Sequence, residues 1–365
     1  MLASPRLIPI YQELYMTRIA KKGRKCIPAA LVLAATLGAG SYAAAQNVKI
    51  TPLGTHDGEL CAFDRATLFE DPTGVRILYD AGRSVTGADD ARLGDVHVVL
   101  LSHAHGDHIG DGKLSAPGAG TCEKPQTVPA VPNSTTAEIA AAKNAVILMV
   151  SDMGVFVGKK VENIRGKPTG ACAQAGGAIS VPQAAPCLAN THLGGSHTTK
   201  APDAKQGVEI TVVYASHANN VPRSLLTEPQ RTQLAADNVS LALGPPTGYV
   251  IKFTNGLTAY LTGDSGIHTE MKTVVHDFHK ANLVQINLGL TAVNGPAAAY
   301  AINDLVKPAS VIASHVNEGA TAQGKLKPLS RTAAFINLVK GRPVHLAISG
   351  RTMAFDGKGK CVAGC

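Results

Sequence analysis

Tryptophan is absent from the 365 residues, and Phe, Trp and Tyr together make up only 4% of them. Charged residues are also few, at 16%, which excludes a coiled coil and a highly charged disordered chain. The hydrophobic content of 45% is enough for a sizeable core. Because Gly (37) and Pro (21) are plentiful, the composition indicates a loop-rich globular protein with one large domain or two ordinary ones.

The net charge of +8 is distributed unevenly. Residues 1–45 contain six basic residues and Glu13 and so contribute +5, whereas the remaining 28 basic and 25 acidic residues contribute +3. A nearly neutral mature chain does not present the basic surface that polyanions require. We therefore expect no nucleic-acid partner.

The basic N-terminal segment precedes an apolar stretch, residues 27–40, and then three alanines at 43–45. This order is typical of a secretory signal with a small-residue cleavage site, so we expect residues 1–45 to be a leader that is removed after Ala45. A start at Met16 would give a signal of ordinary length. A membrane anchor is disfavoured because roughly 14 apolar residues fall short of the ~20 that span a bilayer. The mature chain, 46–365, is expected in the periplasm or outside the cell.

The mature chain contains no Cys-x-x-Cys pair but has six cysteines, an even number. In an exported protein this predicts three disulfides, and the spacing favours Cys172 with Cys187 and Cys361 with Cys365. Metal binding by thiolates is the alternative, although the histidines offer a better site.

Short apolar runs that end in polar or glycine turns predict strands at 48–52, 75–79, 96–101, 208–214, 248–253 and 257–261. Helical patterns at 268–280 and 296–306 each lead into a short strand, at 283–286 and 311–313. Residues 112–190 break this rhythm, and we interpret them as a Cys-containing insertion within one domain. In that stretch Ser134 is expected to cap a helix that runs to Ala145 or beyond, into 146–150.

Three histidines and an aspartate lie within six residues directly after the strand predicted at 96–101. On such a loop His103 and His105 can turn toward one metal ion while Asp107 and His108 turn toward a second. A solvated polar loop is the alternative, but the spacing is too restrictive to favour it.

This His-x-His-x-Asp-His motif resembles the signature of the metallo-β-lactamase superfamily. Asp264 in Thr-Gly-Asp-Ser resembles the family's bridging aspartate, His315 after the last predicted strand resembles its terminal metal histidine, and Asp80 matches an aspartate that supports the metal loop without binding metal. The resemblance implies an α/β fold, a four-layer αββα sandwich. More narrowly, residues 244–250, 263–266 and 270–272 and the turn at 305–308 are similar to the ascorbate-6-phosphate lactonase-like branch, from which His268 departs.

The resemblance requires one more histidine for the first metal, and three candidates compete. His217 follows the strand predicted at 208–214, as the ligands do elsewhere, whereas His192 and His197 lie in a Thr/Gly loop. We therefore predict His217 and expect the other two to be loop residues near the cleft. The expected metal ligands are His103, His105, Asp107, His108, His217, Asp264 and His315.

Such a ligand set implies two divalent ions, best matched by zinc and tolerated by manganese or iron. A hydroxide that bridges them would attack the substrate, with Asp107 as the catalytic residue that orients it. No Gly-x-Ser-x-Gly nucleophile motif occurs. The prediction is an exported hydrolase of a small-molecule ester or lactone. A phosphodiesterase is the first alternative, and a β-lactamase, a redox enzyme on the same fold or a non-catalytic metal-binding protein are less favoured.

Overall fold

The computed structural model describes residues 47–289 and 294–365, all within one compact unit, Ala43–Cys365. The predicted leader, with its apolar stretch and cleavage site, lies outside the described residues. Within the described residues, no helix combines the length and the apolar character needed to cross a membrane.

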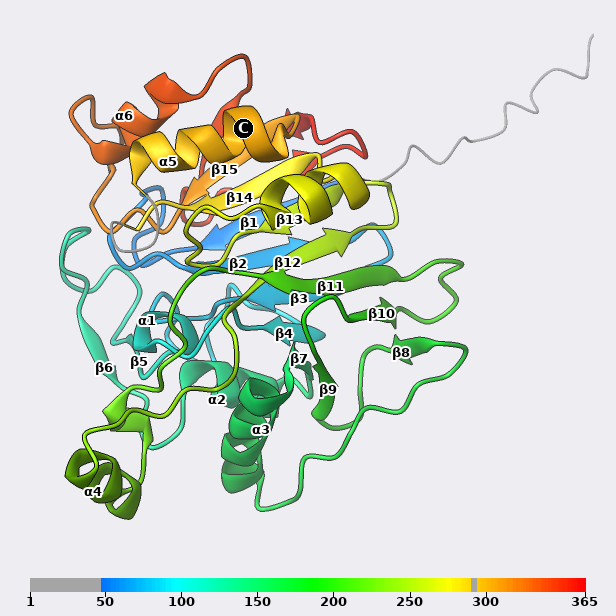
Figure 1. Ribbon diagram of the computed structural model, residues 1–365, viewed down its shortest axis with the longest axis vertical. Coiled ribbons are helices and arrows are strands. Elements are labelled where there is room, and N and C mark those ends of the chain that lie inside the picture. The colour runs from blue at the N-terminus through cyan, green and yellow to red at the C-terminus, as the bar shows by residue number, and fades with distance from the viewer. Residues whose placement is uncertain (1–46, 290–293) are drawn as a thin grey trace, which may run out of the picture. The chain divides into compact units, whose positions relative to one another are not determined.

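Two eight-stranded mixed sheets form the centre of this unit (Figure 1). In the first sheet the strands follow the order β20 (Cys361–Ala363), β19 (Met353–Phe355), β1 (Val48–Leu53), β2 (Ala66–Glu70), β3 (Arg76–Tyr79), β4 (Val98–Leu100), β7 (Val146–Val150) and β9 (Cys187–Thr191). In the second they follow β18 (Val344–Leu346), β15 (Ser310–Ser314), β14 (Leu283–Asn287), β13 (Thr258–Leu261), β12 (Thr247–Lys252), β11 (Val208–Tyr214), β10 (Ser196–Lys200) and β8 (Ala178–Ser180). Two short ribbons pair β5 (Gly112–Leu114) with β6 (Thr127–Pro129) and β16 (Thr321–Ala322) with β17 (Lys325–Leu326).

Helices and short helical turns lie outside the two sheets. They are α1 (Gly106–Ile109), α2 (Thr135–Ala142), α3 (Ser151–Arg165), η1 (Arg223–Leu225), α4 (Glu228–Ala236), η2 (Met271–Phe278), α5 (Gly295–Tyr300), η3 (Ala301–Val306) and α6 (Arg331–Leu338). Helix α3 packs on β7, β9 and α2, whereas α5 packs with α6, and η2 with η3, on the side of the second sheet (Figure 1). The predicted four-layer α/β sandwich is therefore confirmed.

The core lies between the two sheets. Phe69 of the first sheet stacks on Phe253, which follows β12, with ring centroids 6.1 Å apart, and Tyr79 meets Tyr249 edge-on at 6.2 Å. The hydroxyl of Tyr249 donates to the carbonyl of Leu101 at 2.7 Å, so this buried polar group is satisfied across the sheets. Strands β4 and β7 are buried along their whole length, as expected of parallel strands covered on both faces.

The helix predicted to run from Ser134 into residues 146–150 is wrong in its second half. The Ser134 hydroxyl does accept from the amide of Ala137, as predicted for a cap, but α2 ends at Ala142. Asn144 then adopts a positive φ of 51° and the apolar run forms β7, paired with β4 and β9. Residues 112–190 thus supply two strands of the first sheet and the helices α2 and α3. Whether they are an insertion relative to other proteins stays a prediction.

Three disulfides join the six described cysteines. The predicted pairs Cys172–Cys187 and Cys361–Cys365 are both present, and the remaining pair is Cys61–Cys122. The last of these links the loop before β2 to the β5–β6 ribbon, where the amide of Ala62 also donates to the carbonyl of Cys122 at 2.9 Å.

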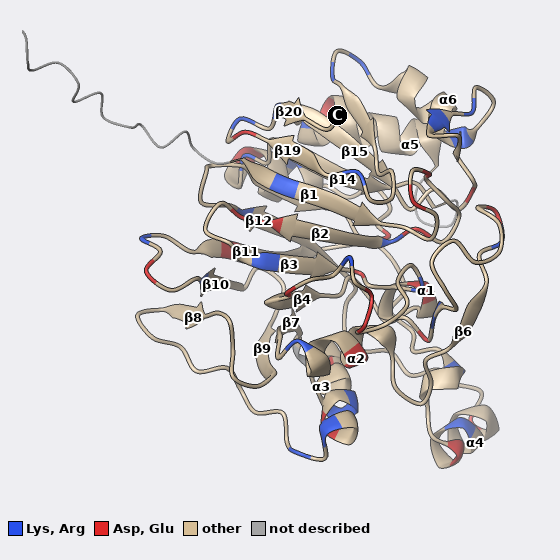
Figure 2. Ribbon diagram, turned by 180° about the vertical axis from the view of Figure 1, so that it is seen from behind, with Lys and Arg blue, Asp and Glu red and all other residues tan. Residues whose placement is uncertain are grey.

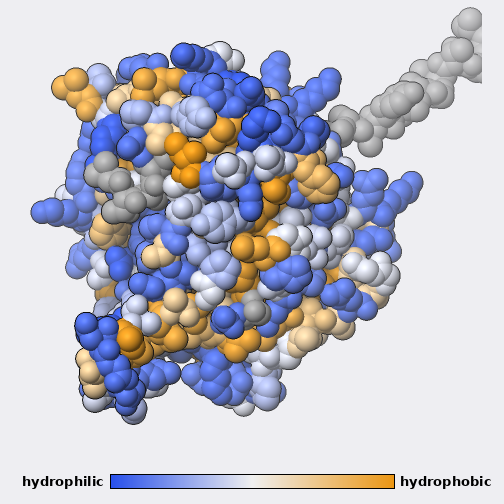
Figure 3. Space-filling view, viewed as in Figure 1, coloured by the Kyte–Doolittle hydropathy of each residue, from blue (hydrophilic) through white to orange (hydrophobic). Residues whose placement is uncertain are grey.

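Charge is mixed over the described surface. Basic and acidic residues are interspersed along the ribbon in Figure 2. Helix α4 projects from the body with none of its residues buried, and its surface is hydrophilic in Figure 3.

Candidate metal centre

The predicted ligands follow the ends of strands that point the same way. In the first sheet β3 and β4 are parallel, and they precede Asp80 and the loop that starts at Ser102. In the second sheet β13, β14 and β15 are parallel, and β11 shares their direction because β11 and β13 are both antiparallel to β12. The carboxyl ends of these strands therefore carry His217, Asp264 and His315 to one edge of the sandwich, where they meet the loop from the first sheet.

The first group of ligands is a cluster of three imidazoles. Nε2 of His103 lies 2.9 Å from Nδ1 of His105. The ring of His217 stands edge-on to both, with centroid distances of 4.9 Å and 5.0 Å. One nitrogen from each ring lies within 4.8 Å of the other two, which is close enough for a shared ion.

The second group combines Asp107, His108 and His315. The Nε2 atoms of the two histidines are 3.0 Å apart. Oδ2 of Asp107 lies 3.6 Å from Nε2 of His108 and 3.4 Å from Nε2 of His315. His108 and His315 are buried, whereas the side chain of Asp107 is 34% exposed and reaches solvent.

Asp264 lies between the two groups. Its Oδ2 is 3.4 Å from His108, 3.3 Å from His315 and 3.9 Å from His217, measured to Nε2 in each case. Its Oδ1 accepts a hydrogen bond from the side-chain Nδ2 of Asn287 at 3.0 Å, which helps to fix the orientation of the carboxylate. The role of Asp264 as a ligand shared by two ions stays a prediction.

The electrostatics of the first group favour metal binding. Burial, aided by neighbouring imidazoles, lowers the pKa of His103 well below its usual value, and burial also lowers the pKa of His105 and of His217. These rings are therefore neutral near pH 7 and keep a lone pair for a cation.

The second group carries the opposite charge balance. Burial would raise the pKa of Asp107 and of Asp264, but His108 and His315 lower both pKa values well below the usual range. Burial would lower the pKa of His108, yet the carboxylates of Asp264, Asp107 and Asp80 raise it well above its usual value. The carboxylates of Asp264 and Asp80 are buried and converge on His108 together with that of Asp107, and a divalent cation would neutralise this concentration of negative charge.

The donor set fits divalent ions. The ring nitrogens of His103 and His105, and those of His108 and His315, approach each other within 3.0 Å. Nitrogen and carboxylate oxygen donors suit zinc, and also manganese or iron. The seven residues predicted as ligands all lie in this cluster; their binding of metal stays a prediction.

Asp80 contacts the metal loop on the side away from the cluster. Its Oδ2 lies 2.8 Å from Nδ1 of His108, and its two oxygens accept from the amide and the hydroxyl of Ser102, each at 2.8 Å. Asp80 and His315 both adopt left-handed backbone conformations, with φ of 44° and 49°. Such conformations are costly for residues with a side chain, and they are found at functional sites as well as at turns.

Gly82 allows the metal loop to pack closely. A Cβ atom there would lie 2.4 Å from the carbonyl oxygen of Asp107 and 3.0 Å from Cβ of Arg65, and φ is +55°. Only glycine tolerates this combination, and its amide donates to the carbonyl of His108 at 3.0 Å.

Three residues that support the cluster were not identified from the sequence. The guanidinium of Arg65 contacts Asp107, Oδ1 of Asn219 accepts from the amide of Ala104 at 2.7 Å, and Asn287 holds Asp264. Asn219 also donates to the carbonyl of Leu243, so it ties the metal loop to the second sheet's connections. None stands in a spacing that signals chemistry; Asn219 lies only two residues after His217, which is the one local hint.

The remaining histidines lie outside the cluster. His192 is exposed in the loop after β9, as expected. The expectation of a loop residue is wrong for His197, which lies on β10 opposite Ile210 of β11, with its Nε2 3.3 Å from the carbonyl of Asn190. Nδ1 of His97 accepts from the amide of Arg76, in agreement with a satisfied, half-buried residue. Both ring nitrogens of His268 are buried without a partner, and its ring meets Tyr214 edge-on.

A third group of potential ligands, His345, Cys361 and Cys365, lies at the sandwich edge. Its two cysteines are bonded to each other, so their sulfurs are not thiolate ligands in this state.

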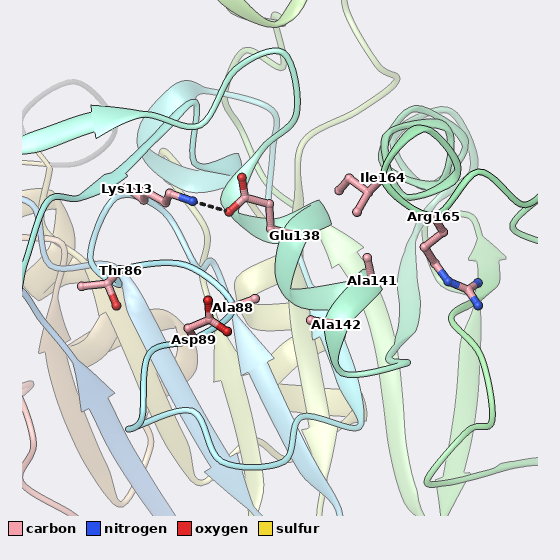
Figure 4. Close-up of a pocket in the computed structure, with 9 residues that line it drawn as sticks. All are labelled: Thr86, Ala88, Asp89, Lys113, Glu138, Ala141, Ala142, Ile164 and Arg165. Atoms are coloured by element: carbon pink, nitrogen blue, oxygen red, sulfur yellow. Dashed lines mark hydrogen bonds and ion pairs between the residues drawn. The ribbon is translucent and has the colours of Figure 1, made fainter.

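Two of the surface hollows differ in how they lie relative to the histidine cluster. One, of about 320 Å³, lies between the loop at Thr86 and helices α2 and α3, and contains an ion pair from Lys113 to Glu138 at 2.8 Å (Figure 4). None of its residues belongs to the histidine cluster. The other, of about 530 Å³, does reach the cluster's surroundings, because it is lined by Ala62, Glu123, Asn317, Glu318, Gly319 and Arg331. Asn317 contacts Arg65, which in turn contacts Asp107.

Comparison with known proteins agrees with this geometry. A family model for the metallo-β-lactamase superfamily matches residues 65–116, which include Asp80 and the histidine motif. A UPF0173 metal-dependent hydrolase of Polynucleobacter asymbioticus is 26% identical over 357 residues, covering 93% of this chain and 100% of the relative. Another, of Cupriavidus taiwanensis, is 25% identical over 234 residues, covering 64% of this chain and 62% of the relative. The chain thus spans less than two thirds of the length of the Cupriavidus relative.

Among solved structures, Igni18, described as a metallo hydrolase from the archaeon Ignicoccus hospitalis, superimposes with a TM-score of 0.51 at 20% identity. The match covers 85% of this chain and 99% of that chain. At this identity the likeness concerns the fold, and it agrees with the four-layer sandwich.

Proposed function

Because the chain belongs to the metallo-β-lactamase superfamily, we propose that it is a metal-dependent hydrolase of small molecules. The observation that carries the proposal is the seven-residue cluster, in which Oδ2 of Asp264 lies within 3.9 Å of histidines from both ligand groups. His103, His105 and His217 would hold one divalent ion, Asp107, His108 and His315 a second, and Asp264 would contact both. Such a pair of ions, when bound, activates water near neutral pH and polarises a carbonyl or phosphoryl oxygen.

Asp107 is the residue of the cluster best placed to act on the reactants. Its side chain is 34% exposed, whereas that of Asp264 is 5% exposed, so only Asp107 offers a carboxylate to both the cluster and solvent. Its low pKa keeps it ionised, and it can therefore accept a hydrogen bond from the attacking water and orient it. Asp264, fixed by Asn287, keeps the two halves of the cluster together.

The hollow of about 530 Å³ next to Asn317 supports an uncharged substrate. Its charged lining residues are Glu123, Glu318 and Arg331, a balance of one negative charge. Arg331 already donates to the carbonyls of Val316 and Asn317, which reduces its availability to an anion. A neutral ester or lactone meets less repulsion there than a phosphodiester. We therefore place ester or lactone hydrolysis first and phosphodiester hydrolysis second.

The test is a substrate panel run on protein reconstituted with zinc, and in parallel with manganese or iron. Lactones and simple esters, phosphodiesters and β-lactams are assayed together with elemental analysis of the same samples. We expect close to two ions per chain and turnover of at least one lactone or ester. A stoichiometry that stays at or below one under metal excess, or turnover restricted to phosphodiesters, would overturn the dinuclear or the lactone proposal respectively.

We further propose that the protein acts in the periplasm or outside the cell. Support comes from the basic and apolar leader pattern and from the six cysteines, all paired. Mass spectrometry of protein recovered from cell fractions tests this: the exported form should begin at Gln46. Full-length protein confined to the cytosol would contradict export.

A further inference from the structure

Arg65 is a buried cation whose every donor is already used. Its side chain is 4% exposed, and it lies beside Asp107, which is one of the proposed metal ligands. Nε and Nη2 donate to Oδ2 of Asp107 at 3.2 Å and 3.0 Å, and Nη2 also donates to Oδ1 of Asn317. Nη1 donates to the carbonyls of Ala62 and Asp64 at 3.1 Å and 3.0 Å. A guanidinium has five N–H donors, and all five have an acceptor here.

Because all five N–H donors of Arg65 are in use, two possible roles for this residue can be distinguished. A residue that binds an anionic or carbonyl substrate needs a free N–H that faces the substrate, and Arg65 has none left. A residue that fixes another side chain needs a rigid fork, which two parallel donors to one carboxylate oxygen provide. The hydrogen bonds therefore favour a positioning role toward Asp107.

Asp107 needs such support because of its exposure. Its neighbours in the cluster are held by burial, but a carboxylate that is 34% exposed can rotate into water. Besides Arg65, the carboxylate of Asp107 lies near His108 of the same short helix α1 and near His315, which follows β15, and both of these are themselves proposed ligands. Arg65 restricts Asp107 to the orientation that faces them.

The position of Arg65 is fixed by the loop of residues 61–65, which a disulfide closes; we call this loop the Arg65 loop. The carbonyl of Ala62, an acceptor for Arg65, belongs to the residue after Cys61, and the amide of Ala62 donates to the carbonyl of Cys122. The Cys61–Cys122 bond joins these two segments covalently. Asp64 completes the loop by accepting from the amides of Thr55 and Cys61 at 2.7 Å and 2.8 Å.

We propose that Arg65 positions Asp107 for the second metal ion and that the Cys61–Cys122 disulfide maintains the conformation of the Arg65 loop. The inference rests on the proposed dinuclear function and adds to it a specific dependence. The ion held by Asp107, His108 and His315 should depend on Arg65 and on this disulfide, whereas the ion held by His103, His105 and His217 should not.

The first experiment measures the two zinc dissociation constants separately, by competition with a chromogenic chelator, for Arg65→Met and Arg65→Lys. Loss of an outer partner of a ligand typically weakens metal affinity about 10- to 100-fold, so Arg65→Met should weaken one ion by this factor and leave the other unchanged. Arg65→Lys, which keeps the charge but not the fork, should fall between. Arg83→Lys is the matched control, because Arg83 pairs with Asp111 near the same loop and contacts no ligand.

The second experiment uses the disulfide and does not depend on how well the Arg65 variants fold. The double variant Cys61→Ser/Cys122→Ser should weaken the same ion, and Cys172→Ser/Cys187→Ser, which removes a disulfide elsewhere, should weaken neither. Circular dichroism confirms that each protein is folded. The Arg65→Met and Cys61→Ser/Cys122→Ser proteins should also recover part of their turnover when zinc is raised, because the weakened ion is then bound. At saturating zinc the remaining defect should lie in kcat more than in KM, because Asp107 is still misplaced.

The outcomes separate this inference from the function on which it rests. If the unmodified protein binds fewer than two ions, the dinuclear proposal fails. If it binds two ions, and the folded Arg65 and Cys61/Cys122 variants bind both as tightly as the controls do, the positioning role of Arg65 is wrong while the proposed function stands. Equal weakening of both ions would also overturn the inference, since it would reveal a general structural effect.

Discussion

Nδ1 of His108 lies 2.8 Å from Oδ2 of Asp80, and this contact joins two segments that are 28 residues apart in the chain. It turns the opposite nitrogen, Nε2, toward Asp107, Asp264 and His315. A carboxylate in this position selects the tautomer of the ring and increases the basicity of the nitrogen that faces the cluster. The orientation of His108 is therefore set from the first sheet, before any ion is present.

Asp80→Asn should weaken metal binding without unfolding the protein. An amide retains one acceptor oxygen, but it cannot accept from Ser102 at both positions and from His108 as the carboxylate does. We expect a loss of about 10- to 100-fold in zinc affinity, measured by chelator competition. Asp71→Asn is the control, because Asp71 is also a buried, multiply bonded aspartate but bonds to Thr73 and Thr254 instead. Equal effects of the two substitutions would contradict the role of Asp80.

Asp107→Asn should reduce the rate of the chemical step more than it weakens substrate binding. The substitution keeps the shape of the side chain but removes the charge that orients the attacking water and binds the second ion. We expect a loss of at least about 100-fold in kcat on whichever substrate the panel identifies, in line with the removal of a preorganised electrostatic group. Metal content and circular dichroism are measured on the same sample. A folded variant with near-normal turnover would show that catalysis occurs elsewhere or by another mechanism.

Much of the framework could be predicted because its signals are local. Alternating or continuous apolar runs that end in turns identified β1, β3, β11 and β13, and the spacing of His103, His105, Asp107 and His108 is compact enough to suggest chemistry by itself. Residues 146–150 show where local apolar patterns do not identify the element correctly. A short apolar run is compatible with a buried helix or a buried strand, and only pairing with β4 and β9 decides between them.

The supporting residues of the site could not be predicted, because their roles arise only after folding. Arg65 precedes a strand and reaches Asp107 42 residues away, and Asn219 reaches the amide of Ala104 across 115 residues. Neither belongs to a spacing pattern. His217 could be chosen over His192 and His197 because the argument used the end of a strand, which is a topological feature, and the structure places His217 alone of the three beside His103 and His105.

Thiol titration tests the redox state of the mature chain. Denatured but unreduced protein should contain almost no free thiol, because all six described cysteines are paired. After reduction, six thiols should appear. Two reactive thiols before reduction would indicate an open pair, and Cys361 with Cys365 would be the first to examine, since their sulfurs lie near His345 and could then bind metal as thiolates. Such a result would contradict the disulfide prediction for the tail.

Asp64 should make the stability of the protein depend on pH in a specific direction. Burial raises the pKa of Asp64 to about 6, although hydrogen bonds from Cys61 and Thr55 act to lower it. The usual value, 3.8, applies to the unfolded chain. The folded state therefore binds the proton more tightly, so this group's contribution to stability is greatest below pH 4 and is lost as the pH rises from about 4 to about 6.

The size of this effect follows from the shift of the Asp64 pKa. Two pKa units correspond to about 3 kcal/mol, so the free energy of unfolding of the unmodified protein, minus that of Asp64→Asn, should fall by up to about 3 kcal/mol between pH 4 and pH 7. Urea unfolding followed by circular dichroism measures it, which suits a chain without tryptophan. Both proteins keep the histidine cluster, so its titration cancels in the difference. A difference that does not change with pH would show that Asp64 titrates with the same pKa in the folded and unfolded chain, which would contradict the effect of burial.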